Sequence, residues 1–198
     1  MEWGHMGKLC YLMLPVILAG IFNMVFVKLP VLDSLKIPMD GGKILSDGKR
    51  LWGDHKTWKG FFGMIVLTAL FMFMFDVLYR HVEWARTLSL IPYGEFPNPV
   101  FSFIWGAIWG FGYVFFELPN SYIKRRIDIS PGKQGSGIIG KVFTVIDQTD
   151  SVIGCVIFMM VFYVPAFKDA IAIIILATLF HYIINILLYL VGLKKQAG

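Results

Sequence analysis

Five long apolar stretches constrain the fold of this chain more than any other feature. They cover roughly residues 9–31, 60–79, 99–119, 141–164 and 169–193, and each has about the 20 residues that a helix needs to cross a bilayer. The backbone of such a segment must satisfy its own hydrogen bonds in lipid, which a helix does. Only 16% of the residues are charged, against about a quarter in soluble domains. We therefore predict an all-α integral membrane protein with five transmembrane helices, forming a single transmembrane domain over residues 1–198.

The two cysteines and the N-terminal residues do not change this prediction. Cys10 and Cys155 both lie inside apolar stretches, and two such residues are too few and too deep for a zinc site or a disulfide framework. Glu2 and the absence of a clear cleavage site argue against a removed signal peptide.

Lysine and arginine gather in two of the connections and in the tail, which predicts the orientation. We expect the N-terminus outside the cell membrane, with both basic loops and the C-terminus in the cytoplasm. The cytoplasmic set is Lys36, Lys43, Lys49, Arg50, Lys56 and Lys59 in the 33–59 loop, Lys124, Arg125, Arg126 and Lys133 in the 120–140 loop, and Lys194 and Lys195 in the tail. The opposite side holds Lys8, Arg80, Arg86 and Lys168.

Both basic loops interleave cations with glycine. Residues 47–61 read DGKRLWGDHKTWKGF and residues 120–141 read NSYIKRRIDISPGKQGSGIIGK. Glycine permits turns that expose backbone N–H groups, and Lys, Arg and Thr add donors, a combination typical of phosphate binding. The alternatives are attraction to anionic lipid for the first loop and cations extending to the headgroups at a helix end for the second.

Two acids interrupt the fourth apolar stretch. Asp147 and Asp150 are three residues apart and so share one helix face. Burying both in a bilayer costs roughly 5–7 kcal/mol, which nearly cancels the gain from the twelve Val, Ile and Phe residues of this segment. Their partner is a divalent cation, a Lys or Arg from the loops, or a shared proton, and a purely structural ion pair is the remaining reading.

Acids beneath two cationic, glycine-rich loops suit one reaction in particular. They would bring a nucleoside triphosphate from the cytoplasm to a lipid phosphate. Because a phosphate oxygen is already a nucleophile, catalysis would consist of positioning and of charge neutralisation at the reacting phosphorus. No Ser-His-Asp or Cys-His pairing stands out in the sequence.

The motifs themselves resemble a known family. SYIKRR (121–126), the Gly/Lys loop after it and DQTD (147–150) resemble the signature of the CTP-dependent phosphatidate cytidylyltransferases. Together with residues 47–61, SYIKRRIDISPGK and VIDQTDSVIG, they look like the archaeal CDP-archaeol synthases. The resemblance departs from the signature in two ways: Gln148 replaces an arginine, and the expected His-Gly-Gly element is missing.

The resemblance implies a reaction and roles for residues. CTP and 2,3-bis-O-geranylgeranyl-sn-glycerol 1-phosphate would give the CDP-lipid and pyrophosphate with Mg²⁺, a step of archaeal phospholipid biosynthesis; no nucleic-acid partner is expected. The implied catalytic residues are Asp147 and Asp150, which would hold the metal, and Lys124 and Arg125, which would meet phosphates. The implied substrate-binding residues are Asp47, Lys49, Arg50, His55, Lys56, Thr57, Lys59, Asn120, Ser121 and Lys133.

Three other functions remain as alternatives. A phosphatidate cytidylyltransferase acting on diacyl lipid shares the signature. A CDP-alcohol phosphotransferase also uses intramembrane aspartates, but its spaced acidic motif with an Ala-Arg pair is absent from the sequence. An ion-coupled transporter would use the acids as a relay, yet paired interrupted helices in two halves of the chain are not seen.

Three charged residues near the ends of the stretches have simpler interpretations. We expect Asp76, at the outer end of the second stretch, to reach water. Lys28, at the inner end of the first stretch, is expected to extend toward the headgroups. Glu117 closes the third stretch and either extends to the interface in the same way or supports Lys124 or a metal.

Overall fold

The computed structural model describes residues 3–133 and 135–192 and is entirely helical apart from loops. Five helices are long and apolar enough to cross a membrane, which confirms the predicted fold class. These are α1 (Trp3–Phe26), α2 (Trp58–His81), α4 (Pro99–Arg126), α5 (Gly137–Met159) and α6 (Phe167–Leu190). A short helix, α3 (Glu83–Leu88), and two 3₁₀ turns, η1 (Asp33–Leu35) and η2 (Tyr93–Glu95), lie in the connections. Lys194 and Lys195 lie outside the described residues.

Several helix boundaries differ from the predicted ones: α1, for example, covers Trp3–Phe26 rather than residues 9–31. Helix α4 continues to Arg126, so Asn120, Ser121 and the three basic residues after them are helical rather than part of a loop. Three cations in a last turn complement the partial negative charge at the helix C-terminus. Helix α5 begins at Gly137 rather than at Lys141. Hydropathy marks only the apolar part of a helix, so it missed the polar last turns of α4. At the start of α5, Gly137 and Gly140 favour a loop in the sequence, although the segment is helical.

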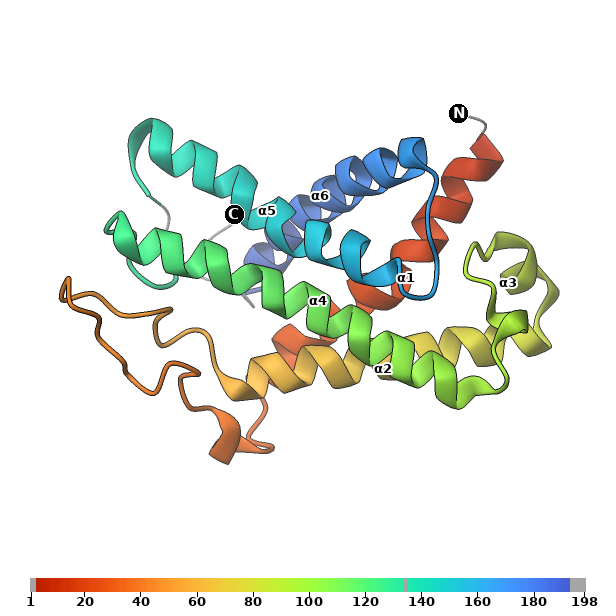
Figure 1. Ribbon diagram of the computed structural model, residues 1–198, viewed down its shortest axis with the longest axis horizontal. Helices are drawn as coiled ribbons and strands as arrows, with labels where there is room; N and C mark the ends of the chain where they lie inside the picture. Colours follow the sequence, from red (N-terminus) through yellow and green to blue (C-terminus); the bar gives the residue numbers. More distant parts are fainter. Residues whose placement is uncertain (1–2, 134, 193–198) are drawn as a thin grey trace.

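The helices pack in a chain of neighbours in which α4 is central (Figure 1). Helix α4 lies against α2 on one side and α5 on the other, α1 packs on α2, and α6 contacts both α5 and α1. Glycines bring α4 close to both partners: Gly106 and Gly110 face the backbone of α2, and Gly112 faces Phe158 of α5. Small residues allow this close approach in membranes, where van der Waals contact drives helix association.

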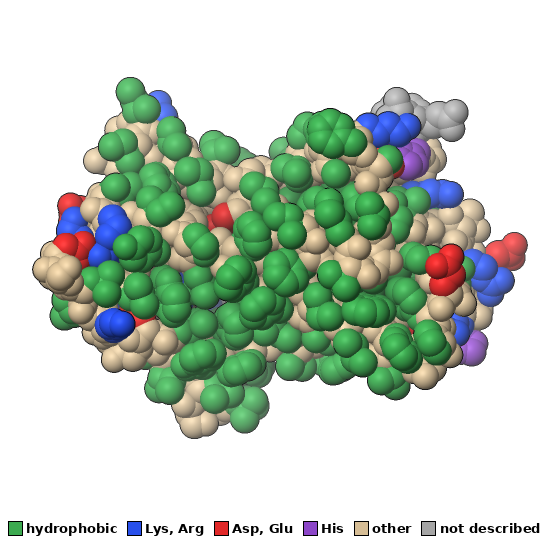
Figure 2. Space-filling view, viewed as in Figure 1, with side chains coloured by type: hydrophobic (Ala, Val, Ile, Leu, Met, Phe, Trp, Pro, Cys, Tyr) green, Lys and Arg blue, Asp and Glu red, His purple; other side chains and the backbone are tan. Residues whose placement is uncertain are grey.

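The surface matches a multi-pass membrane protein. Figure 2 shows hydrophobic side chains over the middle of the molecule and charged ones gathered at its two ends. One end carries the loop of residues 27–57 and the α4–α5 connection, and the other carries α3 (Figure 1).

The prediction that Asp76 reaches water is wrong. Its side chain is fully buried, receives a hydrogen bond from Ser102 and pairs with Arg80 at 2.7 Å. Arg80 also donates to the backbone carbonyls of Tyr93 and Phe96, at 3.1 and 3.2 Å. These two carbonyl groups accept hydrogen bonds from the Arg80 guanidinium. The segment around η2 therefore folds back over this end of α2.

Candidate active site

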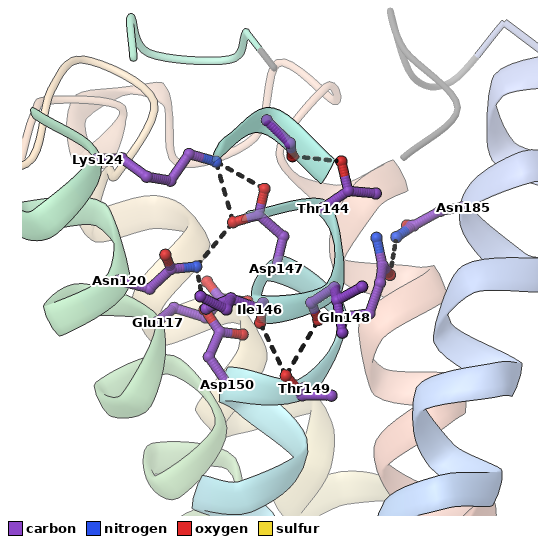
Figure 3. Close-up of polar contacts among 12 residues, drawn as sticks. Glu117, Asn120, Lys124, Thr144, Ile146, Asp147, Gln148, Thr149, Asp150 and Asn185 are labelled. Atoms are coloured by element: carbon purple, nitrogen blue, oxygen red, sulfur yellow. Dashed lines mark hydrogen bonds and ion pairs between the residues drawn. The ribbon is translucent and has the colours of Figure 1, made fainter. Parts of the chain in front are cut away.

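Asp147 and Asp150 of α5 point at α4, where one amide binds both (Figure 3). The Asn120 Nδ2 group donates to Asp147 Oδ1 at 2.7 Å and to Asp150 Oδ2 at 2.6 Å. Lys124, one turn further along α4, donates to both oxygens of Asp147 at 2.9 and 2.6 Å. The i, i+4 spacing of Asn120 and Lys124 places both on the face that meets the two acids.

A second ion pair joins the first basic loop to the same face of α4. Lys56 Nζ lies 2.5 Å from Glu117 Oε2, and both side chains are largely buried. Glu117 precedes Asn120 by three residues and lies beside Asp150 in Figure 3. Of the two readings of Glu117, the structure favours the one in which it supports the site, although through Lys56 rather than Lys124.

The first loop is organised around Asp40, which the sequence analysis did not single out. Its buried carboxylate accepts hydrogen bonds from the backbone N–H groups of Gly42, Trp52 and Gly53 and pairs with Arg50 at 2.6 Å. Burial alone would raise the pKa of Asp40, but these donors hold it well below its usual range. The run Asp-Gly-Gly at 40–42 is the sequence signal for such a turn.

The two basic loops are tied together by their own charges. Arg126 pairs with Asp47 at 2.5 Å, and Lys49 Nζ donates to the Arg126 carbonyl at 2.8 Å. Arg125 is buried and donates to the Trp52 carbonyl at 3.2 Å. These cations therefore hold the first loop against the end of α4.

Gly53 lies where the loops touch. Its φ of +103° is a conformation that side-chain-bearing residues rarely adopt, and a Cβ there would lie 2.6 Å from Pro131 Cγ. The position therefore requires glycine for both conformational and steric reasons.

A cavity of about 940 Å³ lies between the loops and the helices. Its polar end is lined by residues of both basic loops and by the acidic cluster. Its other end runs down between α1, α4, α5 and α6 to an apolar floor that includes Leu12, Met13, Trp109, Met159 and Ile173. The cavity thus joins a cationic opening to an apolar interior.

Comparison of the sequence with known protein families identifies the family of this chain. A family model described as CarS-like, CDP-archaeol synthase, matches residues 6–197. The chain belongs to the CDP-archaeol synthase family. It therefore has the family's activity, a CTP-dependent cytidylyl transfer carried out by an intramembrane enzyme of archaeal lipid biosynthesis.

Individual relatives agree. The CDP-archaeol synthase of Methanoculleus marisnigri is 32% identical over 168 residues, covering 80% of this chain and 87% of the relative. The CDP-archaeol synthase of Thermofilum pendens is 28% identical over 194 residues, covering 96% of this chain and 80% of the relative. A solved structure of an intramembrane enzyme for archaeal membrane lipids biosynthesis shares the fold, with a TM-score of 0.59 at 23% identity over 89% of this chain and 91% of that one.

The structure divides the expected site residues of this CDP-archaeol synthase family member into two groups. One group lines the cavity: His55, Lys56, Thr57, Asn120, Ser121, Lys124, Lys133, Asp147 and Asp150. The other group holds the loops and helix ends around it: Asp47, Lys49, Arg50, Lys59 and Arg125.

Lys59 shows most clearly what the second group does. Its side chain is fully buried and donates to the Leu29 carbonyl at 2.6 Å and to Asp33 at 2.8 Å. The Lys59 ammonium holds the pKa of Asp33 below its usual range. Lys59 thus fastens the start of α2 to the chain that follows α1.

Sequence reasoning missed how α6 contributes. Gln148, the residue that departs from the signature, turns away from α4 and accepts a hydrogen bond from Asn185 Nδ2 at 2.7 Å (Figure 3). His181 Nδ1 lies 3.3 Å from the Gln148 carbonyl oxygen. Helix α6 therefore anchors the side of α5 opposite the two acids.

His55 is a titratable group of the cavity whose charge depends on its surroundings. His55 lines the cavity with an exposed side chain. Loss of water around the ring, followed by the charges of Lys56, Arg125 and Lys124, lowers the pKa of His55 to about 3. The imidazole is therefore neutral at physiological pH and can both donate and accept a hydrogen bond.

Replacing His55 with Gln is expected to leave the shape of the kcat/KM–pH profile unchanged between pH 5 and 8. In that range the folded protein keeps the imidazole neutral, whereas the unfolded chain takes up a proton below about pH 6.5, so acid weakens folding without changing the charge of the site. Steady-state kinetics of both proteins across this range tests the prediction. A limb near pH 6–7 that disappears in His55→Gln would contradict it.

Proposed function

We propose that the cavity is the active site and that Asp147, Asp150, Asn120 and Lys124 form its reacting centre. A single observation carries this assignment: the shared Asn120 amide and the Lys124 ammonium hold two carboxylates together at the wall of a cavity that joins cationic loops to an apolar interior. The two intramembrane acids thus have polar partners on α4 and lie at the cavity wall, where acids inside a membrane usually serve a function.

The reaction is a single substitution at the α-phosphorus of CTP. A phosphate oxygen of the lipid attacks the α-phosphorus of CTP, a new P–O–P linkage forms, and the bond to the β-phosphate oxygen breaks to release pyrophosphate. The cations at the wall neutralise the charge that grows on the leaving pyrophosphate. Lys56 and Lys124 are placed for this role because each lines the cavity and is held by a carboxylate until phosphate arrives.

The nucleotide enters from the loop end in this proposal. His55, Thr57, Ser121 and Lys133 line that end together with the two lysines. Neutral His55 supplies a donor or acceptor for the base or ribose, and Lys133 adds a further cation for the triphosphate.

The apolar end of the cavity receives the lipid tails. Leu12, Met13, Met159 and Ile173 come from three helices and form a wall that only hydrocarbon would fill favourably. We infer that the substrate is the ether-linked 2,3-bis-O-geranylgeranyl-sn-glycerol 1-phosphate, which the family resemblance implies.

The residues present fit Mg²⁺. The donors are hard oxygens: the carboxylates of Asp147 and Asp150 and the buried Asn120 Oδ1, an acceptor without a hydrogen-bond partner among the described residues. Within residues 3–133 and 135–192, no three His, Cys, Asp or Glu side chains gather into a complete metal site. That suits Mg²⁺, which takes one or two carboxylates and completes its shell with water and substrate phosphates. Bound there, it would neutralise phosphate charge.

We further propose that the loop end faces the cytoplasm, where CTP is made, and that the chain acts as one catalytic domain. The Lys and Arg distribution supports this orientation, because most of the basic residues outside the helices lie at the loop end.

Pyrophosphate release by purified protein tests the proposed function. With CTP and Mg²⁺, we expect turnover of the ether lipid phosphate and weaker turnover of diacyl phosphatidate. The matching dialkylglycerol without phosphate, which has no nucleophilic oxyanion, should give none. Preference for the diacyl lipid would overturn the substrate assignment. Uptake of ions by sealed vesicles without CTP would favour the transporter alternative.

A further inference from the structure

Helix α1 presents a continuous stripe to the cavity. The stripe residues recur every three or four positions, as one helix face requires, and all but Asn23 and the last are apolar or glycine. They are Leu12, Met13, Val16, Ile17, Gly20, Ile21, Asn23, Met24, Val27 and Lys28. At 1.5 Å per residue the helical part of the stripe, from Leu12 to Met24, is about 18 Å long, more than half of the hydrocarbon thickness of a bilayer.

A cation ends this stripe. Lys28 lies in the turn after α1, lines the cavity, and its Nζ reaches the Gly192 carbonyl just past α6 at 3.4 Å. Helix α6 forms the facing wall through Ile173, Ala177, Ile184 and Leu188. The α1–α6 side of the cavity therefore pairs a long apolar track with a positive charge at its open end.

Lys28 differs from Lys56 and Lys124, two other lysines of the cavity lining. It shares with Lys36 and Lys133 the absence of a carboxylate within 4.0 Å among the described residues. Lys56 and Lys124 are each neutralised by a carboxylate, at 2.5 and 2.6 Å. Within the described part of the chain, no carboxylate lies within 4.0 Å of the Lys28 ammonium. Among residues 3–133 and 135–192, its ammonium makes a hydrogen bond only to the Gly192 carbonyl, at 3.4 Å. Its charge is thus available to an anion in the cavity.

We propose that Lys28 binds the phosphate of the lipid substrate while the lipid tails lie along the α1 stripe. The two features match an amphiphile with one anionic head and long hydrocarbon chains. The assignment rests on the proposed function, and it places the lipid phosphate on the α1–α6 side of the cavity, with the nucleotide phosphates on the Lys56 and Lys124 side. A cation that only extends to the headgroups would need neither the stripe nor a place in the cavity wall.

Steady-state kinetics separates the two substrates. We expect Lys28→Gln to raise the KM for the ether lipid phosphate about tenfold, because one charge-assisted hydrogen bond is lost, and to leave the KM for CTP unchanged within about twofold. Lys28→Arg should retain most of the lipid affinity. Lys43→Gln is the matched control: it removes a cation from the same end of the molecule, outside the cavity lining, and should change neither KM.

A binding measurement without CTP tests the same assignment independently of turnover. The ether lipid phosphate should raise the thermal unfolding temperature of the wild-type protein more than the phosphate-free dialkylglycerol does. In Lys28→Gln the two lipids should act alike. Lys28 is exposed and makes one long contact, so the variant is expected to fold. Lys28→Ser serves as a second neutral variant.

The outcomes are distinct. A raised KM for CTP with unchanged lipid KM, or an unchanged phosphate-dependent shift in Lys28→Gln, would overturn the Lys28 assignment and leave the proposed function standing. Absence of CTP turnover in the wild type would overturn the proposed function, and the binding measurement would still decide whether Lys28 recognises the lipid phosphate.

Discussion

Asp147→Asn and Asp150→Asn are each expected to reduce CTP turnover by about a thousandfold, the scale on which removing one preorganised charge-stabilising group acts. In the folded protein Asp147 forms an ion pair with Lys124 at 2.6 Å. The Asn120 amide donates hydrogen bonds to both Asp147 and Asp150. An amide in place of either carboxylate keeps the shape but removes the anionic oxygen that a divalent cation requires. At Asp147 it also removes the carboxylate that pairs with Lys124 in a partly buried site.

The metal dependence of these variants adds a second readout. If the acids hold Mg²⁺, the residual activity of each variant should need a higher Mg²⁺ concentration for half-saturation than the wild type. Asp128→Asn is the matched control, because Asp128 is 79% exposed and pairs with Lys49 outside the cavity lining. Wild-type turnover in both acid variants, with unchanged thermal stability, would show that the acids are not part of the reacting centre.

Gly154→Ala is expected to destabilise the protein by about 1–3 kcal/mol, as overpacking does, and to lower activity with it. A Cβ at Gly154 of α5 would lie 2.3 Å from the Gly112 carbonyl oxygen and 2.8 Å from Phe116 Cβ on α4. The nearest atom belongs to the backbone, so the two helices must move apart. Those helices carry Asn120 and Lys124 on one side and Asp147 and Asp150 on the other, so their separation would lengthen every hydrogen bond of the reacting centre.

Thermal unfolding in detergent, with turnover measured well below the transition, tests this prediction. Gly7→Ala is the control: Gly7 lies in α1 with nothing within 4 Å of an added Cβ, and alanine is the better helix former. It should unfold at the wild-type temperature or slightly above. A Gly154→Ala protein with the stability and turnover of the wild type would mean that the α4–α5 contact tolerates a wider spacing.

The residues of the proposed reacting centre could be named from the sequence, but the contacts among them could not. Asp147, Asp150 and Lys124 could be named from the sequence because acids in an apolar helix and cations at a helix end are locally anomalous. The structure shows in addition that Asn120 bridges the two acids and that Glu117 holds Lys56. Both pairings join residues far apart in the sequence, so no local pattern reveals them.

Several cations predicted to bind substrate take part in holding the fold, and their role toward substrate stays a prediction. Lys49, Arg50 and Lys59 have the composition of phosphate ligands, yet they bind Asp128, Asp40 and Asp33 and hold the fold around the cavity. The expectation that Asp76 reaches water failed for the same reason. Which charge meets a ligand and which meets another side chain depends on how the loops pack, and residue type does not contain that information.

The sequence by itself determined the membrane class, the five spans, the family and the acid pair, because transfer into a bilayer and short motifs depend on neighbouring residues alone. The tertiary structure decided how far α4 and α5 extend, which cations line the cavity, and that the α1 stripe ends at Lys28 beside α6. Those features arise from close packing at Gly112 and Gly154 and from ion pairs between distant segments. The free energy of such contacts exists only once the helices have been brought together.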